Sequence, residues 1–234
     1  MTNRKTRPSS SPSVRGEPLR RLVLDGAEQL LRQGNAEFSM RDLAAEAGVS
    51  FATPFNQFGS KAAIMHALSA RRIDTMAERF ARLPHRGHAA ERVLLAIDVA
   101  VAVMIEEPGV NRAVMGWIGT AGPSSGDVLA HSAALWTLAL GAGEGLITDQ
   151  REPVLCDLPR QLAFAFRGVL SFWTAGEMPS EALGPSARAI AGSLLRGFLP
   201  QCSEGLNGSF QASISRPATT DRRREPAFRY RNQR

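Results

Sequence analysis

The 234-residue sequence has only two cysteines, Cys156 and Cys202, which lie too far apart to match a metal-binding spacing. Two isolated thiols also exclude a framework of several disulfides, so we expect a cytoplasmic protein with reduced cysteines. The longest apolar stretch, from Val93 to Ile105, contains Asp98 and is too short to cross a bilayer. The basic N-terminus leads into Ser and Pro without an apolar run, so we expect no signal peptide and no membrane partner.

Strand signatures are also missing, because no segment alternates β-branched and polar residues between turns. Apolar residues instead recur every three or four positions, a spacing that places them on one face of a helix. The sequence therefore predicts an all-α fold without internal repeats. We expect helices at about 18–33, 39–47, 50–57, 60–82, 89–106, 110–120, 127–140, 157–177 and 180–199.

No arrangement of residues suits catalysis. Ser171 and Ser193 have no His or Asp at a recognisable spacing, and adjacent glutamates at 106–107 would point in different directions on a helix. The GxGxG sequence at 141–145 follows a predicted helix rather than a strand, which excludes it as a dinucleotide fingerprint. We therefore expect no enzyme activity, no cofactor and no metal.

The net charge of +6 is concentrated at the two ends of the chain. Residues 1–17 carry a net charge of +3 and residues 216–234 a net charge of +5, which leaves residues 18–215 at −2. We expect the segments 1–17 and 201–234 to be disordered basic tails. On DNA, the seven arginines of the last segment could neutralise phosphates without specifying sequence.

The most informative stretch is residues 38–61, FSMRDLAAEAGVSFATPFNQFGSK. Ser39 followed by Asp42 is typical of a capping box at a helix start, and Gly48 can adopt the left-handed conformation that ends a helix. Ser50 can then cap a second helix, and Ser60 a long third one. Two short helices joined by a Gly-containing turn are typical of a DNA-reading unit whose second helix enters the major groove.

Pro54 leaves two alternatives for the start of that second helix. If Ser50 is the cap, Pro54 is the fourth helical residue and removes the first intrahelical hydrogen bond. If Thr53 is the cap, Pro54 occupies the first helical position, where proline is favoured. The interpretation that we favour is a tightened or late-starting recognition helix.

Three helices with the turn in the middle, and a fourth leading away, resemble the tetracycline-repressor (TetR) family of bacterial transcription regulators. The resemblance covers about residues 20–70. Pro54 departs from the family pattern, which has an aliphatic residue there. The matching residues are LAAEAGVS at 43–50, Thr53, Phe55 where the family usually has Tyr, Phe58, and GSK at 59–61 followed by Leu68.

The resemblance implies a helix-turn-helix DNA-binding domain at 18–60 and a ligand-binding and dimerisation domain at 61–200. It implies a homodimeric repressor that binds a double-stranded DNA operator and is released by a small apolar effector. The alternative is an α-helical small-molecule-binding protein or enzyme without DNA binding, in which residues 38–61 serve only for packing.

The DNA-binding residues expected from the resemblance fall into three groups. Thr53, Asn56 and Gln57 can hydrogen-bond bases or phosphates, and Phe51 or Ala52 can contact a thymine methyl group. Phosphates suit Arg41, Lys61 and the helix starts at Ser39 and Ser50. Phe55 and Phe58 are expected in the core.

The resemblance also implies an apolar cavity among the fourth to eighth helices. We expect bulky residues to line it, namely Met104, Trp117, Trp136, Phe164, Phe166 and Trp173, and the candidate polar groups are Asp98, Asn111, His131 and Arg167. Dimerisation is expected through helices 157–177 and 180–199, where Gly168, Ala187, Ala191 and Gly197 suit close packing.

Overall fold

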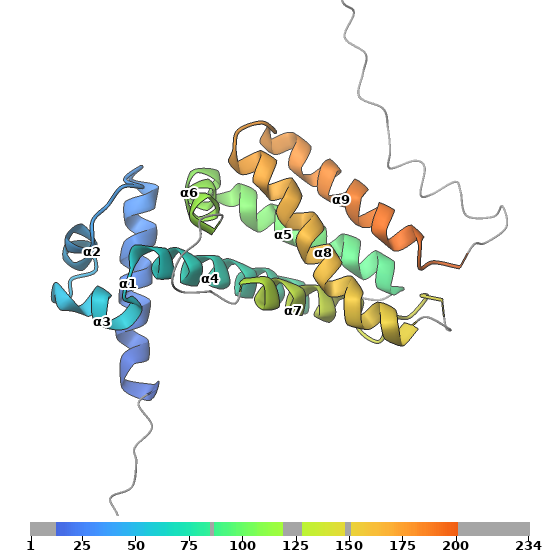
Figure 1. The fold of residues 1–234 in the computed structure, drawn as a ribbon, viewed down its shortest axis with the longest axis horizontal. Helices are drawn as coiled ribbons and strands as arrows, with labels where there is room; N and C mark the ends of the chain where they lie inside the picture. Colours follow the sequence, from blue (N-terminus) through green and yellow to red (C-terminus); the bar gives the residue numbers. More distant parts are fainter. Residues whose placement is uncertain (1–12, 85–86, 119–127, 148–150, 201–234) are drawn as a thin grey trace, which may run out of the picture. The chain divides into compact units, whose positions relative to one another are not determined.

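The structure, a computed structural model, describes residues 13–84, 87–118, 128–147 and 151–200. Helices make up these segments, and no strand occurs in them, which confirms the all-α fold (Figure 1). The expected basic tails lie mostly outside the described residues. The helices are α1 (Ser13–Arg32), α2 (Met40–Glu46), α3 (Ala52–Phe58), α4 (Lys61–Arg82), α5 (Ala89–Glu106), α6 (Pro108–Ile118), α7 (Val128–Leu140), α8 (Arg151–Thr174) and α9 (Ser180–Arg196).

Two helices begin earlier than the sequence suggested. α1 starts at Ser13, so residues 13–17 are helical although we expected them in a disordered tail, and α8 starts at Arg151 rather than near 157. Both helices contain a proline, Pro18 in α1 and Pro159 in α8. Each proline lies inside its helix and removes one backbone hydrogen bond, a cost that the other turns of these long helices can offset. Proline-rich composition was therefore a poor guide to these two boundaries.

The ends of α2 confirm the local signals in the sequence. The Ser39 hydroxyl accepts a hydrogen bond from the Asp42 N–H at 3.2 Å, and the Asp42 carboxylate accepts one from the Ser39 N–H at 2.8 Å. At the other end, Gly48 has φ +63°. The Gly48 and Val49 N–H groups donate to the carbonyls of residues 45 and 44, which forms a Schellman motif.

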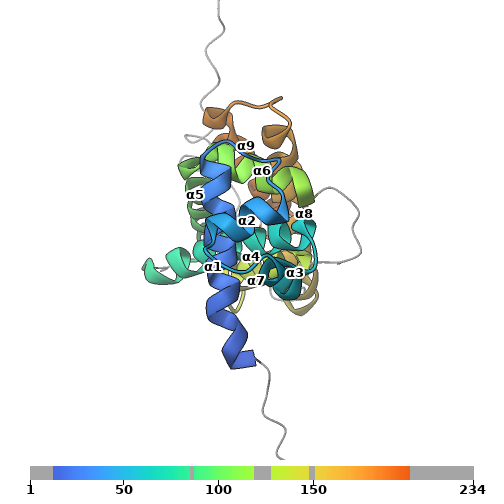
Figure 2. The ribbon, with the colours of Figure 1, turned by 90° about the vertical axis from the view of Figure 1, so that its left-hand side faces the viewer.

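The turn brings α2 against α1. A Cβ atom at Gly26 would lie 3.0 Å from the Cβ of Ala47, so only glycine permits this approach of the two helices. Figure 2 shows α1, α2 and α3 facing the viewer. The first cluster of buried residues lies among these helices, the start of α4, and α6, and contains Val23, Ala27, Leu30, Leu31, Phe38, Leu43, Ile64, Met65, Leu68, Val110 and Val114.

A second cluster of buried residues lies among α4 to α9, with Trp136 and Trp173 as its largest members. α4 contributes to both clusters, with Ile64 and Leu68 in the first and Met76 and Phe80 in the second. α6 also borders both. The domain boundary at residue 60 remains a prediction. α4, which begins at Lys61, packs against both clusters of buried residues.

The expected dimerisation face of α9 was partly wrong. Ala187 and Ala191 are buried in the second cluster, where they pack inside the single chain, and Leu194 packs against the same cluster. The apolar side chain that α9 exposes is Ile190, and α8 exposes Phe164 and Phe172. No helix in the described part of the chain is long and apolar enough to span a membrane.

Candidate nucleic-acid interface and apolar pocket

The recognition helix α3 starts late, at Ala52, with Phe51 as its cap residue. Neither proposed cap is correct, because Ser50 and Thr53 instead form a tight turn. The Thr53 N–H donates to the Ser50 carbonyl at 2.9 Å, and the two hydroxyl oxygens lie 2.8 Å apart. Pro54 becomes the third helical residue, where an N–H has no intrahelical partner to lose. The buried proline ring therefore fits a short α3 without breaking it.

The outer face of α3 carries two exposed aromatic rings. Phe51 is 55% exposed and Phe55 43%, and their ring centroids lie 5.6 Å apart in an edge-to-face arrangement. The guanidinium of Arg41 lies 5.7 Å from the Phe51 ring centroid. We expected Phe55 in the core, and this was wrong because the buried Pro54 beside it turns Phe55 outward. Phe58 does pack against the first cluster, under the guanidinium of Arg20.

The polar candidates on α3 differ in accessibility. Asn56 is exposed, as is Ala52, whereas Thr53 and Gln57 are half-buried. The Gln57 side chain lies near α1, 3.4 Å from the position of a Cβ on Gly16, and the main-chain carbonyl of Gln57 accepts a hydrogen bond from Arg20 at 2.8 Å. Asn56 is therefore better placed than Gln57 to reach a base. Ser39, Arg41 and Ser50 are exposed beside α3, at the starts of α2 and of the tight turn.

Lys61 has a different position from the one expected of a phosphate contact. Its ammonium donates to the Ala36 carbonyl at 2.7 Å and lies 4.4 Å from the Phe38 ring centroid and 5.1 Å from that of Trp117. Burial lowers the pKa of this ammonium from its ordinary value. Lys61 therefore joins α4 to the loop before α2 and to α6.

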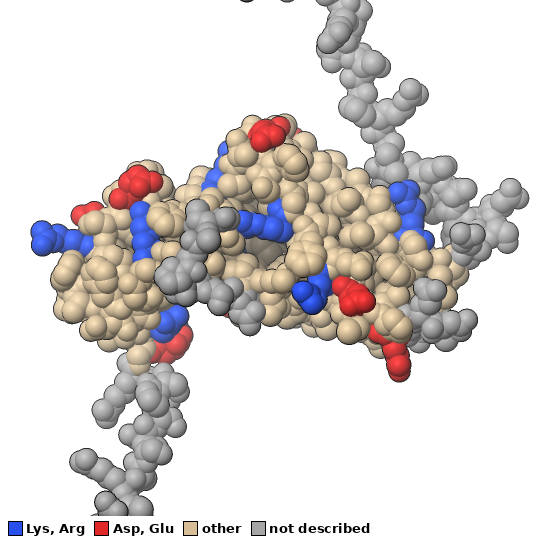
Figure 3. Space-filling view, in the orientation of Figure 1, with Lys and Arg blue, Asp and Glu red and all other residues tan. Residues whose placement is uncertain are grey.

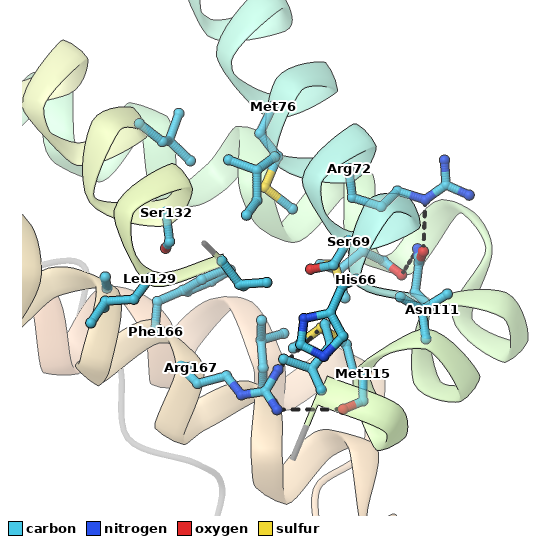
Figure 4. Close-up of a pocket in the computed structure, with 18 of the residues that line it drawn as sticks. His66, Ser69, Arg72, Met76, Asn111, Met115, Leu129, Ser132, Phe166 and Arg167 are labelled. Atoms are coloured by element: carbon cyan, nitrogen blue, oxygen red, sulfur yellow. Dashed lines mark hydrogen bonds between the residues drawn. The ribbon is translucent and has the colours of Figure 1, made fainter. Parts of the chain in front are cut away.

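The second core contains a cavity of about 310 Å³ between α4, α6, α7 and α8 (Figure 4). Of the expected lining residues, Met104, Trp136, Phe164 and Phe166 border it. Trp117 instead packs against the first cluster. Trp173 is fully buried outside the cavity, and its indole N–H donates to Ser180 at 3.1 Å. The volume lies in the range of small-molecule sites, and the lining is mainly apolar.

Sequence reasoning missed the contribution of α4 to this cavity. Five residues of α4 line the wall, and four of them form a regular series, namely His66, Ser69, Ile73 and Met76. Their spacing of three, four and three positions places them on one helix face. The helical spacing of these four residues is visible in the sequence. Because two of them are polar, a criterion based on bulky apolar residues did not select them.

Arg72 is a further lining residue of α4, and it ties the cavity wall to α1. Its guanidinium lies 3.1 Å from Glu28 and 3.3 Å from Glu107, and it donates to the Asn111 side chain at 2.9 Å. The Asn111 amide donates in turn to the Val103 carbonyl at 3.0 Å. The charge of Arg72 is thus compensated within the fold, and the expected polar group Asn111 serves to hold it.

Glu107 also receives a hydrogen bond from Arg32 at 2.5 Å, which lowers the pKa of its carboxyl below the ordinary value; the charges of Arg32 and Arg72 act in the same direction. Two other expected polar groups lie outside the cavity. His131 pairs with Asp74 at 3.0 Å, and Asp98 with Arg188 at 2.5 Å.

Arg167 is the expected polar group that does line the cavity. Its guanidinium donates to the thioether and the carbonyl of Met115, both at the long distance of 3.4 Å. Burial lowers the pKa of this guanidinium from its ordinary value. Among the described residues, no carboxylate forms an ion pair with it.

Comparison with known proteins agrees with this architecture. A TetR transcriptional regulator from Rhodococcus sp. RHA1 has a TM-score of 0.62 and 21% identity, over 76% of this chain and 97% of that one. A tetR-family transcriptional regulator from Streptomyces coelicolor has a TM-score of 0.52 and 19% identity, over 84% of this chain and 95% of that one. At these identities the likeness establishes the fold. Among curated proteins, no sequence matches the chain significantly.

The sequence comparison covers the helix-turn-helix. Residues 23–68, from α1 into α4, match the family model described as bacterial regulatory proteins, tetR family. The match includes the capped α2, the turn at Gly48 and the exposed face of α3, which are the features that the first core positions. Residues 23–68 are therefore similar to the tetR family of bacterial regulatory proteins, and this similarity supports DNA-binding transcriptional regulation as the coarse function.

Proposed function

We propose that the protein is a homodimeric repressor that binds a palindromic DNA operator and is released by a small, largely apolar effector. The observation that carries this proposal is the exposed face of α3, which presents Phe51, Phe55 and Asn56, with Arg41 of α2 near the Phe51 ring. Asn56 can hydrogen-bond a base edge, the two aromatic rings offer apolar contact to thymine methyl groups, and Arg41 can contact a phosphate.

Effector control would act through the helices that the two cores share. α4 packs Ile64 and Leu68 into the first core and presents His66 and Ser69 to the cavity. α6 likewise contributes Val114 to both. A ligand that fills the cavity best in one position of α4 and α6 would also favour one position of α1 to α3. Such differential affinity for two conformations is what release of DNA requires.

Arg72 provides a second connection, because it lines the cavity and contacts Glu28 of α1. The Glu28 side chain is only 9% exposed, and the guanidinium groups of Arg32, Arg71 and Arg72 lie within 3.4 Å of its carboxylate. Movement of Arg72 by a bound ligand would change the environment of α1. We propose this ion pair as the polar part of the coupling between cavity and DNA-binding helices.

The proposed dimer interface consists of the exposed apolar faces of α8 and α9, defined by Phe164, Gly168 and Phe172 and by Ile190. Phe164, Gly168 and Phe172 are spaced by four and follow one ridge of α8, and a Cβ on Gly168 would meet nothing within 4 Å. Burial of this surface against its copy would give a four-helix interface across a two-fold axis.

Footprinting on the DNA that flanks the gene for this protein tests the proposal. We expect protection of two major-groove sites about 34–36 Å apart, related by a palindrome. Asn56→Ala should weaken protection of the operator while the protein remains folded. Retention of ligand binding without any sequence-specific protection would instead favour a small-molecule-binding protein that does not regulate transcription through DNA.

A further inference from the structure

The cavity lining contains polar groups that make long hydrogen bonds, or none, to the described residues. The Trp136 indole nitrogen and the His66 Nδ1 are buried and have no hydrogen-bond partner in the described part of the chain, and both residues line the cavity. Indole N–H is only a donor, and an Arg guanidinium carries five donors and accepts nothing. The Arg167 guanidinium makes two long hydrogen bonds, both to Met115.

The charges around the cavity have one sign. Among the described residues that line it there is no Asp or Glu, while Arg72 and Arg167 are both present. Arg72 is compensated by Glu28 and Glu107, whereas no carboxylate of the described residues pairs with Arg167. Arginine cannot lower the cost of its burial by losing its proton. A ligand with an anionic group would therefore complement the charge of the cavity lining.

We propose that the effector of this protein is an apolar carboxylic acid, bound as its carboxylate by the guanidinium of Arg167. In Figure 4, Arg167 of α8 and His66 of α4 both extend to the side of the cavity that Met115 bounds. Figure 3, drawn in the orientation of Figure 1, shows a hollow in the surface with a basic side chain at its edge. A carboxylate matches the guanidinium because it offers two oxygens to its paired N–H groups.

The rest of the lining indicates the size and the apolar character of the remainder of the ligand. Three methionines, Met76, Met104 and Met115, and the rings of Trp136 and Phe166 offer an adaptable apolar wall. A volume of about 310 Å³ equals that of about ten waters, which suits an organic molecule of roughly ten to fifteen non-hydrogen atoms. The Trp136 indole would favour a further acceptor on that body.

The inference rests on the proposed role of the cavity as the effector site, but its test needs no DNA. Titration calorimetry on the full-length protein would compare 2-naphthoate with 2-naphthalenemethanol, and decanoate with 1-decanol. Each pair shares an apolar body and differs in charge. We expect the acid to bind about ten to a hundred times more tightly than its alcohol, because hydrogen bonds to charged groups are the stronger ones.

Arg167→Met should remove this preference for the acid and leave the affinity for the alcohol within about threefold of the parent, since the apolar wall remains. Arg167→Lys, which keeps the charge but loses the fork of donors, should retain part of the preference. Arg82→Met is the matched control, because Arg82 is exposed at the end of α4 and, among the described residues, forms an ion pair only with Glu78. It should retain the full preference.

Three results would overturn the inference: equal binding of acid and alcohol by the parent protein, a preference that survives Arg167→Met, or no binding of either acid. Equal binding of acid and alcohol, and no binding of either acid, are both measured on the parent protein. The inference can therefore be refuted even if the variants do not fold. Adding 2-naphthoate to the operator complex then tests the proposed function separately. Acid binding through Arg167 without release of DNA would support the site and contradict release by an effector.

Discussion

Replacement of Arg72 by methionine should destabilise the protein, because Arg72 compensates a buried carboxylate. The Glu28 side chain is 9% exposed and that of Arg72 is 15% exposed, and their closest N and O atoms lie 3.1 Å apart. This contact falls short of hydrogen-bond geometry at the Glu28 Oε1 atom, so the attraction is mainly one of charge. Removing one partner of a buried pair costs about 3–5 kcal/mol.

The expected cost for Arg72→Met is smaller than that range. Arg32 and Arg71 each lie 3.4 Å from Glu28 and remain in the variant. The second acidic partner, Glu107, is about one-third exposed and keeps its contact with Arg32. We therefore expect a loss of about 2–3 kcal/mol in the free energy of unfolding, mainly from the incompletely compensated Glu28.

Urea denaturation, followed by tryptophan fluorescence at one protein concentration, measures this loss. A double-mutant cycle with Glu28→Gln should give a coupling energy of about 1–3 kcal/mol, since the two groups share one network. The matched control is the Arg82→Met and Glu78→Gln cycle, where both side chains are mostly exposed, and its coupling should stay below about 0.5 kcal/mol. Equal coupling in both cycles would refute the reasoning.

Three further predictions follow from the described surfaces. Asn56→Ala should cost about 1–3 kcal/mol of operator affinity in a gel-shift assay, with binding to random DNA unchanged, whereas Gln57→Ala should cost less. Ile190→Glu should give monomers or insoluble protein in sedimentation experiments, while Ile105→Glu on α5, at 42% exposure against 39%, should remain dimeric. Glu107 has a lowered pKa and stabilises the fold above about pH 4.5, so the stability difference between the parent and Glu107→Gln should shrink as the pH falls below that value.

The features that the sequence predicted correctly depend on neighbours in the chain. The capping box of Ser39 and Asp42 and the left-handed Gly48 involve groups within a few residues of one another. Sequence alone contains all the partners of such a motif. The late start of α3 follows similarly from Pro54, although the cap proved to be Phe51.

The features that sequence reasoning missed depend on partners far away in the chain. Lys61 looked suitable for phosphates, but its ammonium finds the Ala36 carbonyl and the Trp117 ring, fifty-six positions later. Arg72 lies among other charges of α4, and only the packing of α1 and α6 brings Glu28 and Asn111 to it. Periodicity identified the helices that meet, but it did not identify the atoms that come into contact.

α9 is a further case in which the sequence did not identify the packing partner, and its exposed face supports the proposed dimer. Its small residues Ala187 and Ala191 looked suited to a partner subunit, yet they allow α9 to pack closely inside its own chain. Ile190 lies between them in sequence and is exposed, because successive helical positions point in different directions. A helix that is apolar on more than one face requires more than one apolar neighbour. Since one face already packs against the second core, the face with Ile190 is available for the proposed contact with a second copy of the chain.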